Sequence, residues 1–305
     1  MLRSLVRLLG DHPRLTALLG ALSISFSGVL YLYADVSSET ASFYRCFWGL
    51  PIIAFAAWYE RRERHDTMPR RAVLLAAVAG VLFAGDLIFW HHTIDAVGAG
   101  LATVLGNLQV VIVAIAAWLL FGERPTARTL VALPIVLGGV VLIAGVLGGQ
   151  NYGADPTLGV MLGILTALCY AGYLIIIRQV SRRRIAQPVA VSTATSGAVA
   201  LAVGLALGSI DLFPGAESML WLILLGITAQ SLGYLFISIS LPRLPAVVTS
   251  IILLVQPVLA VLFAIVLVGE APSAGQMLGV AMVIGGIALA TIPLGRLRRR
   301  PAPAI

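Results

Sequence analysis

Stretches of about 20 mainly apolar residues, the length that a helix needs to cross a bilayer, alternate along the chain with short polar or turn-forming links. Ten stretches qualify: 15–34, 39–59, 72–91, 97–121, 128–148, 158–177, 187–208, 219–239, 245–268 and 275–294. The links between them are too short to form a soluble domain. The pattern therefore predicts an all-α integral membrane protein with ten transmembrane helices.

The composition agrees with this class and excludes several others. Hydrophobic residues make up 60% of the 305 residues and charged residues only 11%, whereas a soluble domain carries roughly a quarter charged residues. A soluble, disordered or nucleic-acid-binding protein is therefore excluded. Cys46 and Cys169 both lie inside apolar stretches, where a thiol behaves as a small hydrophobic group. Their placement indicates neither a disulfide nor a metal site, and we expect no cofactor.

The arginines predict how the helices are oriented. All 20 basic residues are arginines, and Arg45 is the one that lies well inside an apolar stretch. If the N-terminus lies in the cytoplasm, the other 19 fall in cytoplasmic segments and none falls in an outer loop. Since this is the partition that the positive-inside rule requires, the net charge of +7 orients the chain. We expect a multi-pass protein of the bacterial cytoplasmic (inner) membrane with both termini in the cytoplasm.

The sequence repeats itself at an offset of 147 residues. The motif Gly-Glu-x-Pro closes the fourth stretch at 122–125 and the ninth at 269–272. At the same offset Gln109 falls on Gln256, and the pair at 138–139 falls on the pair at 285–286. Five spans is an odd number, so the second copy enters the membrane from the opposite face. The chain is thus predicted to consist of two inverted repeats, 15–148 and 158–294, an architecture of transporters.

The two Gly-Glu-x-Pro closures, each followed by a helix that contains Gly-Gly, and the duplicated plan resemble the EamA-type transporters of the drug/metabolite transporter superfamily. The resemblance covers about 15–294, and the run 85–91 resembles a segment of one subgroup. It implies a secondary transporter that exports a small metabolite such as an amino acid by alternating access, and it does not identify the substrate. One position departs from the family: Val110 stands where a proline is common, whereas Pro257 is present in the second copy. We therefore expect the fourth span to be straighter than the ninth.

Two charged residues fall inside predicted spans at a similar depth, Arg45 in the second and Asp86 in the third. A charge at the centre of a bilayer costs roughly 2.5–3.5 kcal/mol on insertion scales, so the two are expected to pair. The pair is either structural or a site that binds substrate or a proton. Trp90 shares the helix face of Asp86 one turn on. At the repeat offset Asp86 aligns with Gly233, so the acid is not a requirement of both halves.

Uncharged polar and aromatic side chains supply the remaining candidates for substrate binding. Asn107 and Gln109 lie about 200° apart on a helix, and we favour the Asn107 face as the cavity lining. Polar or aromatic stripes at helical spacing occur at 23, 27 and 31, at 166, 170 and 173, and at 230, 234 and 238. The predicted substrate-contacting residues are Ser27, Trp90, Asn107, Tyr170, Tyr173, Gln230, Tyr234 and Gln256. His91 and His92 are expected at the outer mouth as interfacial residues.

Two other classes of protein remain as alternatives, an intramembrane enzyme and a non-transporting membrane scaffold. An aspartyl protease would need a second intramembrane aspartate beside Asp86, and Phe83 stands where its Gly-x-Gly-Asp motif would begin. None of the four histidines lies deep in a predicted span, as Ser–His chemistry would require. The expected partners are a small-molecule substrate and membrane lipid, with no nucleic acid, and a homodimer is left open.

Overall fold

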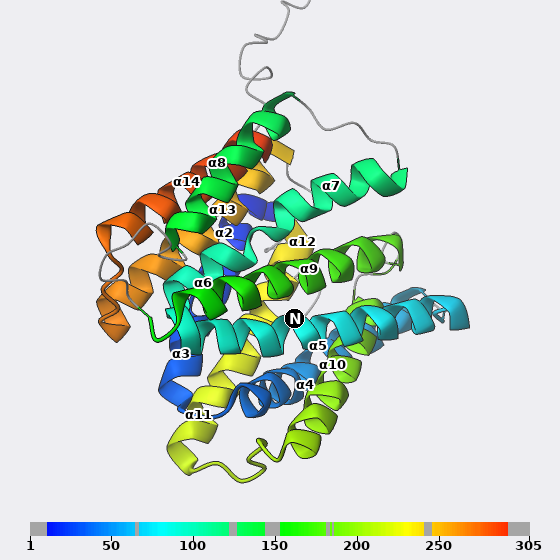
Figure 1. Cartoon of the computed structure of the whole chain (residues 1–305). Helices are drawn as coiled ribbons and strands as arrows, with labels where there is room; N and C mark the ends of the chain where they lie inside the picture. The colour runs from blue at the N-terminus through cyan, green and yellow to red at the C-terminus, as the bar shows by residue number, and fades with distance from the viewer. Residues whose placement is uncertain are drawn as a thin grey trace, which may run out of the picture.

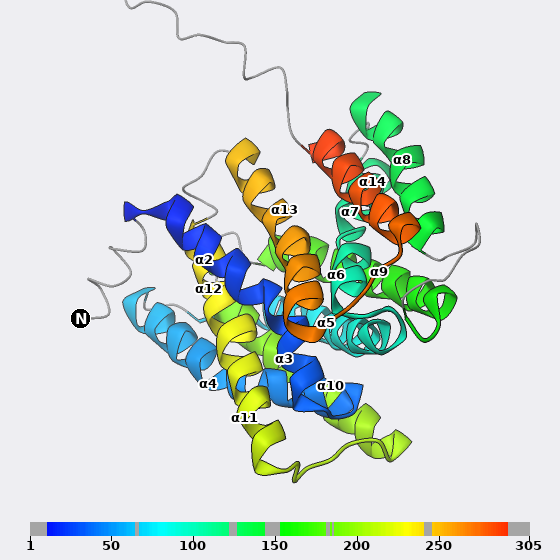
Figure 2. The same cartoon turned by 90° about the vertical axis from the view of Figure 1, so that its left-hand side faces the viewer.

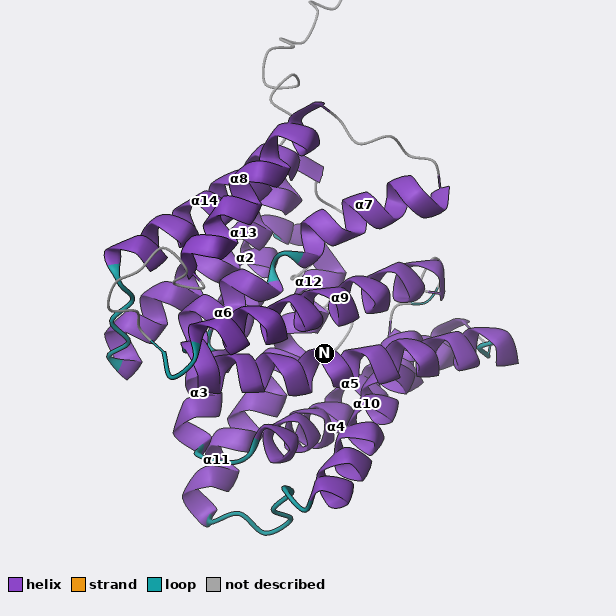
Figure 3. Cartoon of the chain, in the orientation of Figure 1, coloured by secondary structure: helices purple, strands orange, loops and turns teal. Residues whose placement is uncertain are grey.

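The computed structural model describes residues 11–64, 67–121, 127–143, 153–180, 184, 186–240 and 246–291. Throughout these residues the ordered elements are helices, joined by short links (Figure 3). In chain order they are α2 (Pro13–Ser25), α3 (Ser27–Ala34), α4 (Ser38–Arg64), α5 (Arg70–Val97), α6 (Ala99–Gly106), α7 (Gln109–Phe121), α8 (Ala127–Ile143), α9 (Pro156–Val180), α10 (Ala186–Leu207), α11 (Ala216–Leu225), the π-helix η1 (Gly226–Gly233), α12 (Tyr234–Ser240), α13 (Ala246–Phe263), the π-helix η3 (Ala264–Val268) and α14 (Ala274–Thr291).

The prediction of an all-helical protein with several membrane spans is confirmed. Within the described residues, five helical segments are long and apolar enough to cross a bilayer: Pro13–Ala34, Arg70–Val97, Pro156–Ile177, Ala186–Leu207 and Ala216–Ile237. Shorter apolar helices occupy four further segments: Ala99–Val113, Leu130–Ile143, Val255–Val268 and Ala274–Leu289. Each of the ten predicted stretches coincides with helix in the described residues. A total of ten membrane spans stays a prediction, because the shorter helices do not by themselves reach the length of the bilayer.

The fourth span does not have the regular course that the absence of a proline led us to expect. The fourth span is interrupted between α6 and α7, where the Nδ2 of Asn107 donates to the carbonyl oxygen of Thr103 at 2.8 Å. The backbone N–H of Leu108 bonds to the Leu105 carbonyl at 3.0 Å, in a tighter turn than an α-helix makes. The ninth span instead continues as α-helix through Pro257 to Phe263. A side-chain amide that bonds to the preceding turn offers the backbone an alternative to the helical ladder, and here this outweighs the proline.

Helices of the two halves of the chain pack beside each other. Figures 1 and 2 show α5 next to α9, α8 next to α14 and α4 next to α10, and these pairs make the most extensive helix contacts. A Cβ added at Gly139 would lie 2.7 Å from the carbonyl oxygen of Gly279, so the α8 and α14 backbones touch at this point. Glycine permits such close helix approach in membranes.

The contacts between α8 and α14 repeat at the same 147-residue offset as the sequence. Gly139 faces Gly279 and Val283, and Gly286 faces Ala132 and Val136. Each residue of the second set is related to one of the first set by 147 positions. Positions rise along α8 as they fall along α14, so the two helices run antiparallel. Reciprocal contacts of this kind are the signature of a two-fold axis between the packed elements.

Close backbone contact also brings α4 against η1. A Cβ added at Gly226 would lie 3.0 Å from both the backbone oxygen of Arg45 and the backbone nitrogen of Gly49. A Cβ added at Gly49 would lie 2.6 Å from the Cγ of Gln230. The two glycines therefore let Arg45 on α4 and Gln230 on η1 approach each other inside the bundle.

Candidate functional site

Arg45 on α4 and Asp86 on α5 are both buried, with 4% and 9% of their surfaces exposed. They are near enough to interact electrostatically, but the structure shows no direct ion pair between these two residues. The Nε of Arg45 instead donates to the Oε1 of Gln230 at 3.2 Å, and its guanidinium lies 5.5 Å from the ring centre of Trp90. The two charges are therefore close enough to influence each other without forming a direct ion pair, and whether they act as a structural pair or as a binding site stays a prediction.

The π-helix η1 sets the position of Gln230. A π-helix makes wider turns than an α-helix and often occurs at functional sites. From η1 the fully buried Gln230 side chain reaches two other helices, accepting from Arg45 on α4 and donating from its Nε2 to the Oγ1 of Thr193 on α10 at 3.2 Å. Both ends of the amide are thereby engaged, so the orientation of Gln230 is determined by its partners.

Aromatic side chains from both halves of the chain form a wall beside the charged residues. Tyr170 and Tyr173 of α9 stack with ring centres 5.8 Å apart, and Tyr173 stacks on Phe83 of α5 at 4.8 Å. Phe83 also meets Tyr234 of α12 edge to face at 5.9 Å. The carboxylate of Asp86 interacts electrostatically with all three tyrosines. We call the following set the charged–aromatic cluster: Arg45, Phe83, Asp86, Trp90, Tyr170, Tyr173, Gln230 and Tyr234.

Three of the predicted substrate-contacting residues take no part in the hydrogen bonds or ring contacts of this cluster. Ser27 bonds to the carbonyl oxygen of Ile24 at 2.6 Å, beside the junction of α2 and α3. The amide of Asn107 is used at the α6–α7 interruption. The backbone oxygen of Gln256 accepts from the Oγ of Ser25 at 3.2 Å. That these three residues contact substrate stays a prediction, as it does for the members of the cluster.

A polar network at one end of the bundle went unrecognised in the sequence. The hydroxyl of Tyr31 donates to both carboxylate oxygens of Asp95, at 2.8 and 3.0 Å, and Ser38 donates to the same carboxylate at 3.1 Å. His92 pairs with the Oε1 of Glu39 at 3.0 Å. The available signal was the pair His92 and Asp95, three positions apart on α5, since residues at this spacing share a helix face.

The expectation that His91 is an interfacial residue is wrong. Its side chain is fully buried, packed against Tyr31 with ring centres 4.4 Å apart and against Trp90 at 5.1 Å. Its Nδ1 lies 2.9 Å from the Oγ of Ser42. Helix α5 continues to Val97 rather than ending near residue 91, so His91 lies within a span that is longer than predicted.

The same end of the bundle is held together by hydrogen bonds between the two halves. We call it the Glu270 end. The carboxylate of Glu270 accepts from the backbone N–H groups of Ala99 and Gly100 at the start of α6. Tyr33 donates to the carbonyl oxygen of Leu267 at 2.8 Å. Further bonds join Ser37 to Ser209, Tyr44 to Leu212 and Asp155 to Ala96. Glu123, the counterpart of Glu270 in the first closure, lies outside the described residues.

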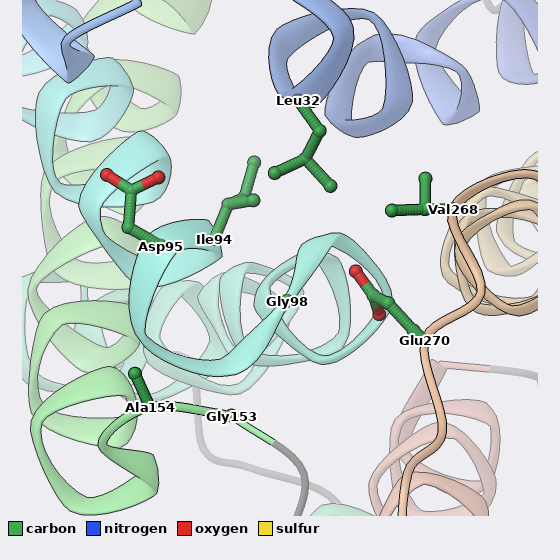
Figure 4. Close-up of a pocket in the computed structure, with 8 residues that line it drawn as sticks. All are labelled: Leu32, Ile94, Asp95, Gly98, Gly153, Ala154, Val268 and Glu270. Atoms are coloured by element: carbon green, nitrogen blue, oxygen red, sulfur yellow. The ribbon is translucent and has the colours of Figure 1, made fainter. Parts of the chain in front are cut away.

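An open pocket of about 500 Å³ lies at the Glu270 end. Figure 4 shows Glu270 directed toward Gly98 at the α5–α6 link, with Asp95 on the far side of Ile94. Burial raises the pKa of Glu270, and the two N–H donors from α6 offset part of this rise. A carboxylate at the N-terminus of a helix also interacts favourably with the helix dipole, so Glu270 caps α6 from across the two halves.

Comparison with known proteins identifies the class of this molecule. The apolar helices are those of a multi-pass membrane protein, and the family that the chain matches indicates a transporter rather than an enzyme. Two segments, 14–145 and 157–292, match the EamA-like transporter family, and the chain belongs to this family. The predicted resemblance to the drug/metabolite transporter superfamily is thereby confirmed.

Individual relatives agree with this assignment. The chain is 31% identical over 275 residues to an uncharacterised protein of Pseudomonas aeruginosa, covering 88% of this chain and 90% of that protein. It is 26% identical over 259 residues to an uncharacterised transporter of Archaeoglobus fulgidus, covering 84% and 88%. A crystal structure with 19% sequence identity has a similar fold, with a TM-score of 0.64 over 92% of this chain and 98% of the other.

Proposed function

We propose that the protein is a secondary transporter that exports a small metabolite, such as an amino acid, across the bacterial cytoplasmic membrane by alternating access. The observation that carries the proposal is a pair of buried, opposite charges without a direct ion pair. A charged residue inside a membrane span is costly and usually marks a substrate or ion pathway. Here the elements around the charges come from both halves: α4 and α5 from the first, and α9, η1 and α12 from the second.

Two inverted repeats, 15–148 and 158–294, supply the moving parts in this proposal. The antiparallel α8–α14 crossing, with reciprocal contacts at Gly139 and Gly286, supports a two-fold axis perpendicular to these helices. For helices that cross a bilayer, such an axis lies in the membrane plane. Transporters with this symmetry bind substrate near the midplane and expose it to one side and then the other.

The hydrogen bonds at the Glu270 end support one particular state of the cycle. With both termini in the cytoplasm, this end faces the outside. The two halves are then joined on the outer side by the hydrogen bonds of Glu270, Tyr33, Ser37 and Tyr44. In this state the protein is closed to the outside, and substrate enters from the cytoplasm. Release requires these bonds to break and contacts on the cytoplasmic side to form.

Asp86 is the group that we assign to coupling. A carboxylate without a fixed partner can take up a proton in one conformation and release it in the other. Transport would thereby be linked to the proton gradient. In the alternative role, Asp86 only offsets the charge of Arg45, and its removal would leave a buried arginine uncompensated, which is strongly destabilising.

The test is transport by the purified protein in sealed proteoliposomes, with a panel of amino acids, nucleosides and sugars, with and without a pH gradient. We expect at least one of these solutes to cross, faster with the gradient than without it. We expect Asp86→Asn to reconstitute normally, to exchange that solute across the membrane and to ignore the gradient. If no solute crosses, the transport proposal fails. Wild-type gradient-driven transport by Asp86→Asn would exclude Asp86 as the proton carrier, and loss of folded protein would assign it the structural role.

A further inference from the structure

The two charged groups of the cluster have charged atoms without a hydrogen-bond partner among the described residues. Among the described residues Arg45 forms one hydrogen bond, from its Nε to Gln230, and its Nη atoms form none. The carboxylate of Asp86 accepts no hydrogen bond in the same part of the chain, although it is nine-tenths buried. Neither group is sealed in, as the Nε2 atom of His91 is. A group of the size of water can therefore reach each of them.

A buried charge without a partner is costly, and the cost falls when a ligand supplies the opposite charge. A guanidinium binds a carboxylate through two parallel N–H donors. Asp86 would bind an ammonium group through a charge-assisted hydrogen bond. A ligand with only one charge would compensate only one of the two residues. A ligand with both charges compensates both, and the occupied site stays neutral.

The contacts of Arg45 leave its two Nη atoms for a carboxylate. Trp90 covers a face of the guanidinium at 5.5 Å, and Gln230 engages its Nε. The two Nη atoms remain, and they form the terminal edge of the guanidinium fork. Arg45 and Asp86 interact electrostatically without a direct ion pair, so a zwitterion that pairs with both would supply the two partners that they lack.

The aromatic wall defines the rest of the ligand. Tyr170 and Tyr234 are half-buried, and both interact electrostatically with Asp86. Phe83 and Tyr173 back this wall with stacked rings. Such surfaces favour apolar and aromatic groups over the many hydroxyls of a sugar, because buried hydroxyls need hydrogen-bond partners.

We propose that the charged–aromatic cluster is a zwitterion site, in which Arg45 binds the carboxylate and Asp86 the ammonium group of an α-amino acid with an apolar or aromatic side chain. The inference rests on the proposed function as a transporter and names the substrate class of that site. It separates amino acids from nucleosides, sugars, simple amines and simple carboxylates, which carry at most one of the two charges.

The experiment measures binding to the full-length wild-type protein in nanodiscs by isothermal titration calorimetry. The probes are L-phenylalanine and L-leucine, each with its analogue lacking the carboxylate (phenethylamine, 3-methylbutylamine) and its analogue lacking the ammonium group (3-phenylpropionate, 4-methylpentanoate). We expect at least one amino acid to bind at least about tenfold more tightly than both of its analogues. Because this series uses only the wild-type protein, it tests the site even if a variant fails to fold.

Two variants then assign each charge. In Arg45→Gln the preference for the amino acid over its amine should disappear, and in Asp86→Asn the preference over its carboxylic acid should disappear. Arg71→Gln and Glu217→Gln, which change exposed residues, serve as matched controls and should bind as the wild type does. If either variant does not fold, Arg45→Lys or Asp86→Glu replaces it and should weaken binding of the amino acid while retaining the preference.

The inference is overturned if neither amino acid binds the wild type, or if a singly charged analogue binds as tightly as its amino acid. It is also overturned if both folded variants keep the wild-type preferences. These outcomes are distinct from failure of the proposed function. A protein that moves a nucleoside or sugar in proteoliposomes but binds no amino acid refutes the zwitterion site and leaves transport intact.

Discussion

Arg45 in the first half of the chain donates through its Nε to the Oε1 of Gln230 in the second half, at 3.2 Å. The two residues are not related by the repeat. At the 147-residue offset Arg45 corresponds to Ser192, and Gln230 corresponds to Phe83. The backbone is therefore duplicated while the charged site is single. Under the proposed alternating access, two symmetric backbone states would act on one charged site.

Removing the Gln230 side chain should destabilise the protein. Gln230→Leu leaves the Nε of Arg45 buried without a partner, and an unsatisfied buried donor costs about 1–3 kcal/mol, more when it is charged. We expect a lower melting temperature in detergent, measured by intrinsic fluorescence. Thr193→Val removes only the second bond of the same amide and should have a smaller effect. Equal stability of Gln230→Leu and the wild type would contradict the importance of this bond.

The α8–α14 crossing should respond to substitution in the same way from either half. Gly139→Ala and Gly286→Ala each place a methyl group 2.7 and 2.5 Å from the facing helix, and overpacking typically costs about 1–3 kcal/mol. Gly285→Ala is the matched control, because a Cβ there meets nothing within 4 Å. We expect thermal unfolding to show similar losses for the first two variants and none for the control. A loss confined to one half would count against the two-fold relation.

The cap provided by Glu270 should make stability depend on pH. Burial raises the pKa of this carboxyl above its ordinary value of 4.5, so the folded protein holds the proton more tightly than the unfolded chain does. The resulting stabilisation is complete below pH 4.5 and is lost as the pH rises through the raised pKa. Glu270→Gln, which does not titrate, should lack this component when melting temperatures are measured across pH.

A second variant separates the charge of Glu270 from its hydrogen bonds. Glu270→Ala removes the acceptor for Ala99 and Gly100, and losing a helix cap costs about 0.5–2 kcal/mol. This loss should appear at every pH. If Glu270→Gln retains the full pH dependence of the wild type, another group is responsible.

The orientation of the chain can be tested by labelling single cysteines. In a background without Cys46 and Cys169, a cysteine at position 71 should react only from the cytoplasmic side and one at position 215 only from outside. Both native residues, Arg71 and Gly215, are exposed. The expectation rests on the distribution of the arginines. Reaction at position 71 from outside would show that the topology is the opposite of the expected one. It would also contradict the proposed direction of transport.

Tyr170 and Tyr234 should contribute to binding rather than to folding. Truncation of either to leucine removes a half-buried aromatic ring, and an aromatic pair contributes about 0.5–1.5 kcal/mol beyond its buried area. We expect weaker substrate binding at normal yield of folded protein. Leu168→Ala, on an exposed position of the same helix as Tyr170, should leave binding unchanged. Normal binding by both tyrosine variants would exclude them from the site.

The sequence alone determined the class of protein and the approximate positions of its helices. Insertion into a bilayer depends on runs of apolar residues, because every backbone polar group must be satisfied within its own segment. This local requirement is readable along the chain, as are the duplicated Gly-Glu-x-Pro closures. Arg45 and Asp86 were recognisable for the same reason, since a charge is conspicuous in an apolar run.

Tertiary structure alone decided how distant residues meet. The π-helix that carries Gln230 and the burial of His91 involve packing between helices that are far apart in sequence. The cap that Glu270 places on α6 joins residues 171 positions apart. Each of these features is a hydrogen bond or a steric fit between segments, and the energy of such contacts arises only when the helices have assembled. The apolar runs in the sequence therefore predicted where the helices lie, and the packing of the helices brought the residues of the charged–aromatic cluster together.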